Sequence, residues 1–171
     1  TELEGRPILI VGTRKGYKKD LRAAKGVITA FKPVLVGVGE GAEALLAEGF
    51  QPDIIIARAA QISRKMWQSG AELIVHIDPH QQSEQEDFAS FSSDTHVLPC
   101  LGNSEEAALL LGYEKGGEWL ITVGVRSHMR DFLAQGEEDM RSALLVRMKV
   151  GERLVDFKSL QALAIPSHHW S

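Results

Sequence analysis

Residues 33–57 read PVLVGVGEGAEALLAEGFQPDIIIA, and this stretch decides the fold class. Two continuously apolar runs, residues 33–38 and 53–57, flank a segment whose apolar positions have helical spacing and which ends at Gly49. Strands that are apolar on both faces and are joined through a helix are typical of parallel sheets covered on both sides. The stretch therefore predicts one strand–helix–strand unit of an α/β protein.

The same alternation continues on both sides of this unit. Further strands are expected at residues 7–11, 73–77, 96–98 and 119–123, with a last edge strand at 154–157. Further helices are expected at residues 20–31, 63–68, 83–91, 104–113, 129–133 and 137–149. Ser63 and Ser104 have the residue type that caps a helix N-terminus. The sequence thus predicts a three-layer α/β fold with a mostly parallel sheet and helices on both faces.

The composition is that of one folded domain spanning residues 1–171. Hydrophobic residues make up 44% of the 171, which suffices for a sizeable core. The formal net charge of −4 gives no basic field, so no nucleic-acid partner is expected. Cys100 is the single cysteine, so no internal disulfide can form, and a small buried side chain is its expected role. No apolar run approaches the ~20 residues of a membrane-spanning helix.

Ligands of parallel sheets bind at the carboxyl ends of the strands, so the loops that follow strands hold the candidate site. The glycines of Gly39, Glu40 and Gly41 permit a tight turn or a close approach to a nucleotide, although the Glu40 carboxylate would repel a pyrophosphate. The loop at residues 12–19 holds cations that either bind a phosphate at a helix N-terminus or are simply solvated. These cations are Arg14, Lys15, Lys18 and Lys19.

The loop after the third strand offers Arg58 and no carboxylate, so it has no hard oxygen ligand for Mg²⁺. The loop before residues 104–113 offers Asn103, Ser104 and Glu105 as ligand-binding candidates, although helix capping also explains them.

Residues 76–80 alternate His76, Asp78 and His80, which are ligand types of transition metals. Pro79 interrupts the strand there, and two or three ligands in one loop rarely complete a site. No metal site is therefore expected. Because no Ser–His–Asp or Cys–His arrangement can be assigned from spacing, no catalytic residue is expected either.

Several short sequence segments, in a fixed order along the chain, resemble those of a known family. They are residues 31–38, 41–46, 51–56, 70–76, 102–110, 113–116 and 150–156. Over about residues 6–160, the chain resembles the thiamin-pyrophosphokinase-like domain of the SteA-type septation proteins of Gram-positive bacteria. The resemblance implies the fold of the thiamin pyrophosphokinase catalytic domain. It also implies a longer, membrane-anchored parent protein of which this chain is the soluble middle piece, and the start at Thr1 agrees with this expectation.

The family resemblance further implies a role at the division septum or in daughter-cell separation, on the cytoplasmic side of the membrane. The family usually has Asp-Gly-Gly-Ala-Asp where residues 39–43 read GEGAE, and Gly-Asp-Met-Asp-Ser where residues 57–61 read ARAAQ. In true pyrophosphokinases such carboxylates serve Mg²⁺ and the transferring phosphates. Their loss at positions 39, 58 and 60 implies a pseudoenzyme.

Three functions stay open at this point. The first is a non-catalytic domain that contacts proteins of the division machinery or a second copy of itself. The second is a sensor that binds a nucleotide or phosphate without Mg²⁺ through the loop cations. The third is an active diphosphokinase with relocated ligands from Glu40, Glu43 and Glu105. Trp67 and Phe91 either offer a contact surface or pack on the sheet, and Trp119 is expected in the core.

Overall fold

The structure is a computed structural model of the chain, and it describes residues 1–80, 95–100, 102–125 and 149–163. The helices predicted at residues 83–91 and 129–133 lie outside these ranges, together with Phe91 and all but the last residue of the helix predicted at 137–149.

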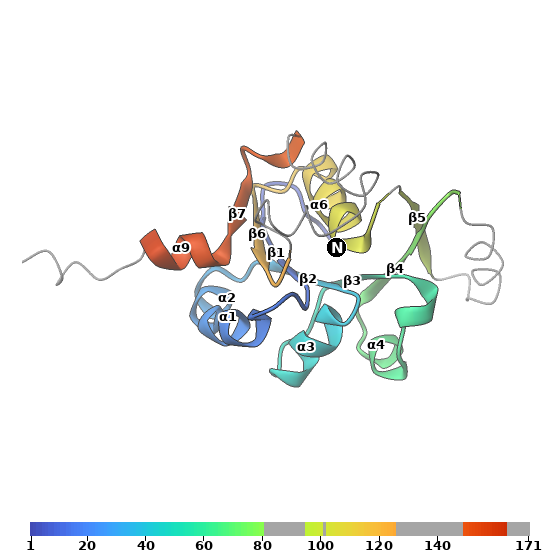
Figure 1. The fold of residues 1–171 in the computed structure, drawn as a ribbon, viewed down its shortest axis with the longest axis horizontal. Helices are drawn as coiled ribbons and strands as arrows, with labels where there is room; N and C mark the ends of the chain where they lie inside the picture. The colour runs from blue at the N-terminus through green and yellow to red at the C-terminus, as the bar shows by residue number, and fades with distance from the viewer. Residues whose placement is uncertain (81–94, 101, 126–148, 164–171) are drawn as a thin grey trace, which may run out of the picture.

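Seven parallel strands form one sheet in the order β5-β4-β3-β2-β1-β6-β7 (Figure 1). The strands are β1 Pro7–Val11, β2 Val34–Val38, β3 Ile54–Ala57, β4 Glu72–Ile77, β5 His96–Pro99, β6 Trp119–Val123 and β7 Leu154–Asp156. β1 lies inside the sheet, where Ile8 pairs with Val34 on one side and with Leu120 on the other. The predicted α/β class is confirmed, and every pair of described strands is parallel.

Helices cover both faces of this sheet (Figure 1). They are α1 Tyr17–Ala23, α2 Lys25–Phe31, α3 Gly41–Ala47, the 3₁₀ turn η1 Ala59–Gln61, α4 Arg64–Gln68, α6 Ser104–Glu114 and α9 Phe157–Leu163. α1 to α4 lie on one side of the sheet, and α6 lies on the other (Figure 1). Leu9 and Leu35 pack with Leu21 and Leu45 of the α1–α4 side, whereas Ile8, Ile10 and Val36 share a cluster with Leu109 of α6. This alternation follows from the two-residue period of a strand.

The helix predicted at residues 20–31 is two helices, because Ala24 closes α1 with backbone bonds to Asp20 and Arg22 before α2 begins. Phe157, predicted at the end of the last strand, is instead the first residue of α9, a helix that was not predicted from the sequence. Phe157 is buried against the α1 side of the sheet, and Lys158 Nζ lies 3.6 Å from Asp20 Oδ2. These contacts attach α9 to α1.

Trp119 was expected in the core, and this expectation is wrong, since 46% of its surface is exposed. Trp119 is the first residue of β6, at the amino edge of the sheet, where it lines a groove with Phe31 at the end of α2. Within the described ranges, none of the helices is long and apolar enough to cross a membrane.

Candidate functional site

Two loops at the carboxyl edge of the sheet converge on the turn that begins α6. Arg14, which follows β1, places its Nε 3.1 Å from Glu105 Oε1. Arg58, which follows β3, donates from a terminal guanidinium nitrogen to the Gly102 carbonyl oxygen over 3.3 Å. Guanidinium groups suit such bonds because their charge and donor geometry are fixed. Two arginines from distant loops thus hold the turn that begins α6.

The N-terminus of α6 is capped by Asn103 rather than by Ser104. Asn103 Oδ1 accepts a hydrogen bond from the Glu106 N–H, and the Glu106 carboxylate accepts one from the Asn103 N–H. This reciprocal pair is a capping box, and it satisfies two donors that a helix start leaves free. The expectation that Ser104 caps the helix is therefore wrong, because the amide side chain one position earlier takes that role and Ser104 becomes the first helical residue.

Ser104 instead bonds to a histidine inside the protein. His76 is 1% exposed, with Nδ1 3.0 Å from Ser104 Oγ and Nε2 2.8 Å from the Cys100 carbonyl oxygen. Because a carbonyl can only accept, Nε2 carries the proton in the neutral ring, and the Ser104 hydroxyl donates to Nδ1. The ring therefore joins β4, the end of β5 and α6, and it lies inside whereas His80 is exposed.

The glycine inside β2 and those in the loop that follows it are required by close backbone packing or by the turn geometry. A Cβ at Gly41 would lie 2.0 Å from the Val11 carbonyl oxygen, and a Cβ at Gly37 would lie 2.5 Å from the Ala42 Cα. Gly39 has a φ of 54°, in the left-handed region that side chains disfavour. The space beside Gly37 and Gly41 is thus filled by the chain itself, as a tight turn with close backbone approach requires.

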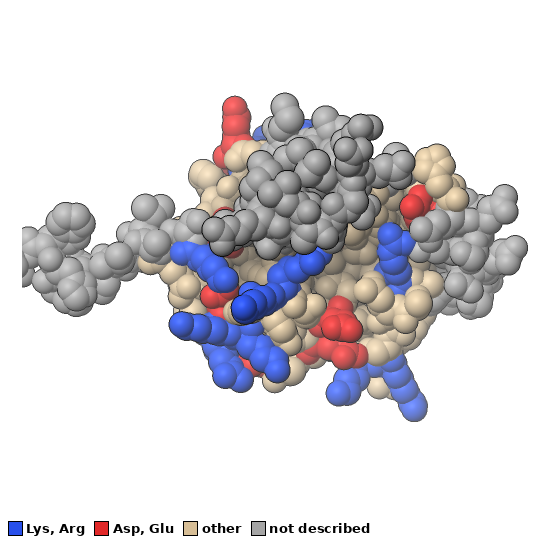
Figure 2. Space-filling view, viewed as in Figure 1, with Lys and Arg blue, Asp and Glu red and all other residues tan. Residues whose placement is uncertain are grey.

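The remaining predicted site residues do not join this cluster. Lys15 is exposed and makes no ion pair with another residue of the described ranges. Glu40 lines a separate groove of about 570 Å³ together with Lys18, Glu43 and Lys65. In the space-filling view, basic atoms gather over α1 and α2 and over α4, with acidic atoms over α3 between them (Figure 2). This groove therefore presents mixed charge rather than a phosphate cradle.

Burial and charge also act on the thiol at the end of β5. Burial raises the pKa of Cys100, and the nearby Glu106 carboxylate raises it further. A thiol whose ionised form is disfavoured is a poor nucleophile at neutral pH. Among the described residues, no three His, Cys, Asp or Glu side chains are grouped so that they could hold a metal ion.

The sequence did not predict His76 as a member of this cluster, since it offered this histidine only as a metal ligand or as a polar residue at a strand end. A histidine between Val75 and Ile77, in a strand with buried neighbours, needs a buried partner, and this was the available signal. The backbone carbonyl groups of Cys100 and Gly102 could not be predicted as hydrogen-bond partners, because every residue type has a backbone carbonyl.

No family model matches the chain, and no curated protein matches its sequence. The chain is similar to two thiamin pyrophosphokinases of known structure. The enzyme from Geobacillus thermodenitrificans has 18% identity and a TM-score of 0.48, and the one from Bacillus subtilis has 15% and 0.46. Each likeness covers 86% of this chain and 58% of the other, so the chain spans less than two thirds of either enzyme.

Proposed function

We propose that this chain is a non-catalytic domain of a SteA-like protein that acts in bacterial septation or cell separation. It would act through contacts with proteins of the division machinery on the cytoplasmic side of the membrane. One observation supports the non-catalytic part: Arg14 and Arg58 both bond to the turn that begins α6, through Glu105 and the Gly102 carbonyl. The septation part rests on the resemblance carried by the sequence phrases.

The arginine contacts oppose pyrophosphoryl transfer for an electrostatic reason. Such transfer depends on carboxylates that position Mg²⁺ between the phosphates. Arg58 and Ala60 stand where the resemblance would place two of them, and Arg58 brings a positive charge that repels a divalent cation. Arg14 pairs with Glu105, one of the two acidic residues in the first turn of α6, and the other, Glu106, is held by the capping box. The two arginines at the carboxyl edge of the sheet thus hold its loops against one another.

A surface suited to protein contact lies at the amino edge, beside α2 and α9. Phe31 is 71% exposed and Trp119 is 46% exposed, and both line an apolar groove of about 550 Å³. Val27, Ile121 and Leu160 provide further apolar walls. Exposed aromatic side chains around an apolar hollow are typical of surfaces that a protein partner covers. A protein of the division machinery would bind in this groove.

Two measurements test the proposal. The purified chain, incubated with ATP, thiamin and Mg²⁺, should form no thiamin diphosphate under conditions in which an authentic pyrophosphokinase does. In a strain lacking the parent gene, the full-length protein with Trp119→Ser should fail to restore cell separation. Trp67→Ser, which changes a similarly exposed tryptophan of α4, should restore it. Product formation, or restoration by the Trp119 variant, would contradict the proposal.

A second candidate is a sensor that binds a nucleotide or phosphate without Mg²⁺. The observation that favours it is a pair of neighbouring acceptors at the carboxyl ends of β6 and β7, Thr122 Oγ1 and Asp156 Oδ2. Both are buried and have no hydrogen-bond partner within the described part of the chain. Buried acceptors of this kind fit a ligand that donates hydrogen bonds, such as the amino group of a nucleotide base, whereas the Asp156 carboxylate would repel a phosphate placed beside it. The backbone N–H of Arg14 donates to the carbonyl oxygen of Gly124, two residues after Thr122.

A thermal-shift titration with ATP, ADP, GTP and thiamin, each with and without Mg²⁺, separates these functions. A ligand that binds only the folded chain raises the melting temperature. A Mg²⁺-independent rise that Arg58→Ala removes supports the sensor, and a Mg²⁺-dependent rise supports catalysis. No rise with any compound leaves protein contact as the function to pursue.

A further inference from the structure

The charge of the chain is unevenly distributed along its sequence. Residues 14–32, which comprise α1, α2 and the residues beside them, hold seven Lys and Arg side chains and one carboxylate, that of Asp20. Their formal charge is therefore +6 in a chain whose total is −4, so the other residues together carry −10. An asymmetry of this size is typical of proteins that bind an anionic surface or polymer through one face.

The exposed cations of this segment lie on the outer side of α1 and α2. The inner side is buried, since α1 buries Asp20 and Leu21 and α2 buries Ile28. We call the outer side the α1–α2 face, and its exposed cations are Lys15, Lys18, Lys19, Arg22 and Lys25. In the space-filling view, basic atoms gather over these two helices (Figure 2). The face is thus a compact cationic surface.

Few carboxylates offset the charge of the α1–α2 face. Asp20 is 7% exposed, and its Oδ2 lies 3.6 Å from the Nζ of Lys158, which brings a further cation from α9. Glu48 pairs with Arg22 at 3.3 Å and with Lys25 at 3.2 Å. The other three cations of the face make no ion pair with any residue in the described ranges, and they are Lys15, Lys18 and Lys19. The face therefore keeps a net positive charge.

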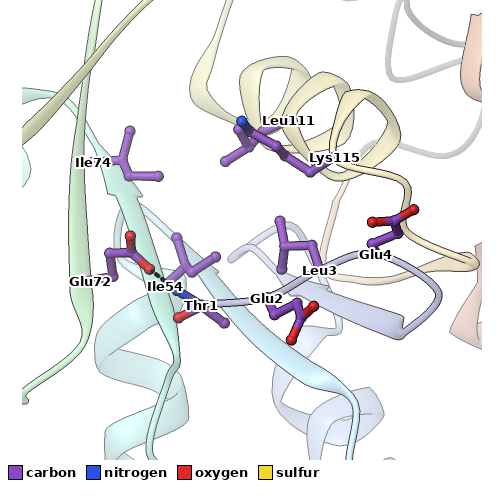
Figure 3. A pocket seen from close by; sticks show the side chains of 9 residues that line it. All are labelled: Thr1, Glu2, Leu3, Glu4, Ile54, Glu72, Ile74, Leu111 and Lys115. Carbon is purple, nitrogen blue, oxygen red and sulfur yellow. Dashed lines mark hydrogen bonds and ion pairs between the residues drawn. The ribbon is translucent and has the colours of Figure 1, made fainter.

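A group of carboxylates lies on the opposite side of the sheet. Glu2, Glu4 and Glu72 line a hollow of about 360 Å³ between the N-terminal segment, β3, β4 and α6 (Figure 3). Lys115 is the one basic side chain of its lining. α6 lies across the sheet from α1 and α2 (Figure 1). An anionic surface thus attracts one side of the molecule and repels the other, which orients the chain with the α1–α2 face toward that surface.

The arrangement of the cations fits a bilayer better than a nucleic acid. Acidic atoms over α3 separate the basic atoms over α1 and α2 from those over α4 (Figure 2). Glu40 and Glu43 line the groove that also holds Lys18 and Lys65, so a strand following this groove would bring its phosphates beside carboxylates. Anionic lipids, in contrast, diffuse laterally and can gather under a compact cationic patch, so they need no continuous track.

The residue types also favour a diffuse anionic surface over a single bound phosphate. Four of the five cations on the α1–α2 face are lysines. A lysine ammonium is a strongly hydrated point charge on a flexible stem, and it lacks the fixed donor geometry by which arginine recognises one phosphate. Such charges act through the summed field of the surface that they face.

We propose that the α1–α2 face binds the surface of an anionic phospholipid bilayer. Lys15, Lys18 and Lys19 lie at the lipid headgroups, and the acidic hollow on the α6 side faces away from them. Binding is electrostatic and reversible, because no acyl chain enters the protein. It uses no part of the groove at Phe31 and Trp119, and it rests on the proposed function only for the location beside a membrane.

The test is co-sedimentation of the purified chain with vesicles of phosphatidylglycerol and phosphatidylcholine in about a 1:2 ratio, compared with vesicles of phosphatidylcholine alone. The chain should partition onto the anionic vesicles at least about tenfold more strongly than onto the neutral ones. Raising the salt from about 0.1 M to about 1 M should release the chain, because the Debye length falls from about 10 Å to about 3 Å.

A pair of double variants with equal net charge locates the binding surface. Lys18→Gln with Lys19→Gln should lower the partition constant at least about tenfold, since each basic residue near the surface contributes about fivefold. The matched control is Lys115→Gln with Lys149→Gln, which removes the same charge at the end of α6, where Lys149 pairs with Glu114. The control should bind within about twofold of the parent chain. All four lysines are exposed, so both variants should melt with the parent.

Three results would each overturn the proposal: equal binding to neutral and anionic vesicles, an equal loss in both double variants, or displacement of the chain by duplex DNA at equal phosphate concentration. The last result would assign the α1–α2 face to a nucleic acid. Trp119→Ser should bind vesicles like the parent, and a loss in this variant would also contradict the assignment to the α1–α2 face. Since vesicle binding needs no protein of the division machinery, its failure would leave the proposed function standing, and the converse also holds.

Discussion

Replacing Gly41 by alanine tests whether the glycines after β2 serve packing. The added Cβ would lie 2.0 Å from the Val11 carbonyl oxygen and 2.7 Å from the Val11 carbonyl carbon. Side-chain carbons do not approach other atoms within 3.0 Å, so the start of α3 must move away from β1 by about 1 Å. Both elements are buried backbone, and no flexible side chain can give way. We expect Gly41→Ala to lower the free energy of unfolding by about 2–3 kcal/mol.

Thermal unfolding followed by circular dichroism measures this change, because each kcal/mol corresponds to about 2–4 °C for a chain of this length. Gly41→Ala should therefore melt about 4–12 °C below the parent chain. Gly26→Ala in α2 is the matched control, since a Cβ there has no atom within 4 Å. It should raise stability by about 0.5–1 kcal/mol, because alanine favours helix. A Gly41→Ala chain that melts with the parent, or a Gly26→Ala chain that melts equally early, would refute the packing argument.

Three further predictions concern buried and paired groups. His76→Phe should cost about 2–4 kcal/mol in urea unfolding, since it leaves the Ser104 hydroxyl and a carbonyl unpaired, and an unchanged midpoint would contradict the bonding described. Alkylation of Cys100 by iodoacetamide at pH 8 should be on the order of tenfold slower in the folded chain than in urea, because burial raises its pKa, and equal rates would exclude this. The hydrogen bond from Lys25 lowers the pKa of Glu48, so this pair stabilises the folded chain above the ordinary carboxyl pKa and loses its effect as pH falls. The parent should thus exceed Glu48→Gln in stability at pH 7 and not at pH 3, and a gap that persists at pH 3 would argue against the pair.

The alternation of apolar runs predicted the sheet well, because a parallel strand that is covered on both faces is built almost entirely from apolar residues. The runs at 7–11 and 119–123 coincide with β1 and β6, and the short edge strand at 154–157 is β7 without its last residue. The division at Ala24 was not predicted, since alanine favours helix and its residue type gives no signal for a turn. Trp119 was placed wrongly because an apolar residue type at a strand start does not reveal whether a helix covers it.

The sequence predicted several residues of the candidate site but not the hydrogen bonds and ion pairs that they form. Arg14, Arg58 and Glu105 were named from their loops, and the rule that ligands meet at the carboxyl ends of strands placed them near one another. Their actual partners depend on how far each loop extends, which no pattern of residue types records. The turn glycines were ambiguous for the same reason, since both a ligand and a neighbouring backbone require the space of a missing Cβ.

The position of β1 inside the sheet has a consequence for synthesis on the ribosome. One edge of β1 pairs with β2 soon after both emerge, but the other edge must wait for β6, because Pro7 pairs with Trp119. At about 5–20 residues per second, translation of the ~110 intervening residues takes roughly 5–20 s. During that time the hydrogen-bonding groups of an apolar strand remain uncovered, so the nascent chain is most prone to association before its last third has been translated.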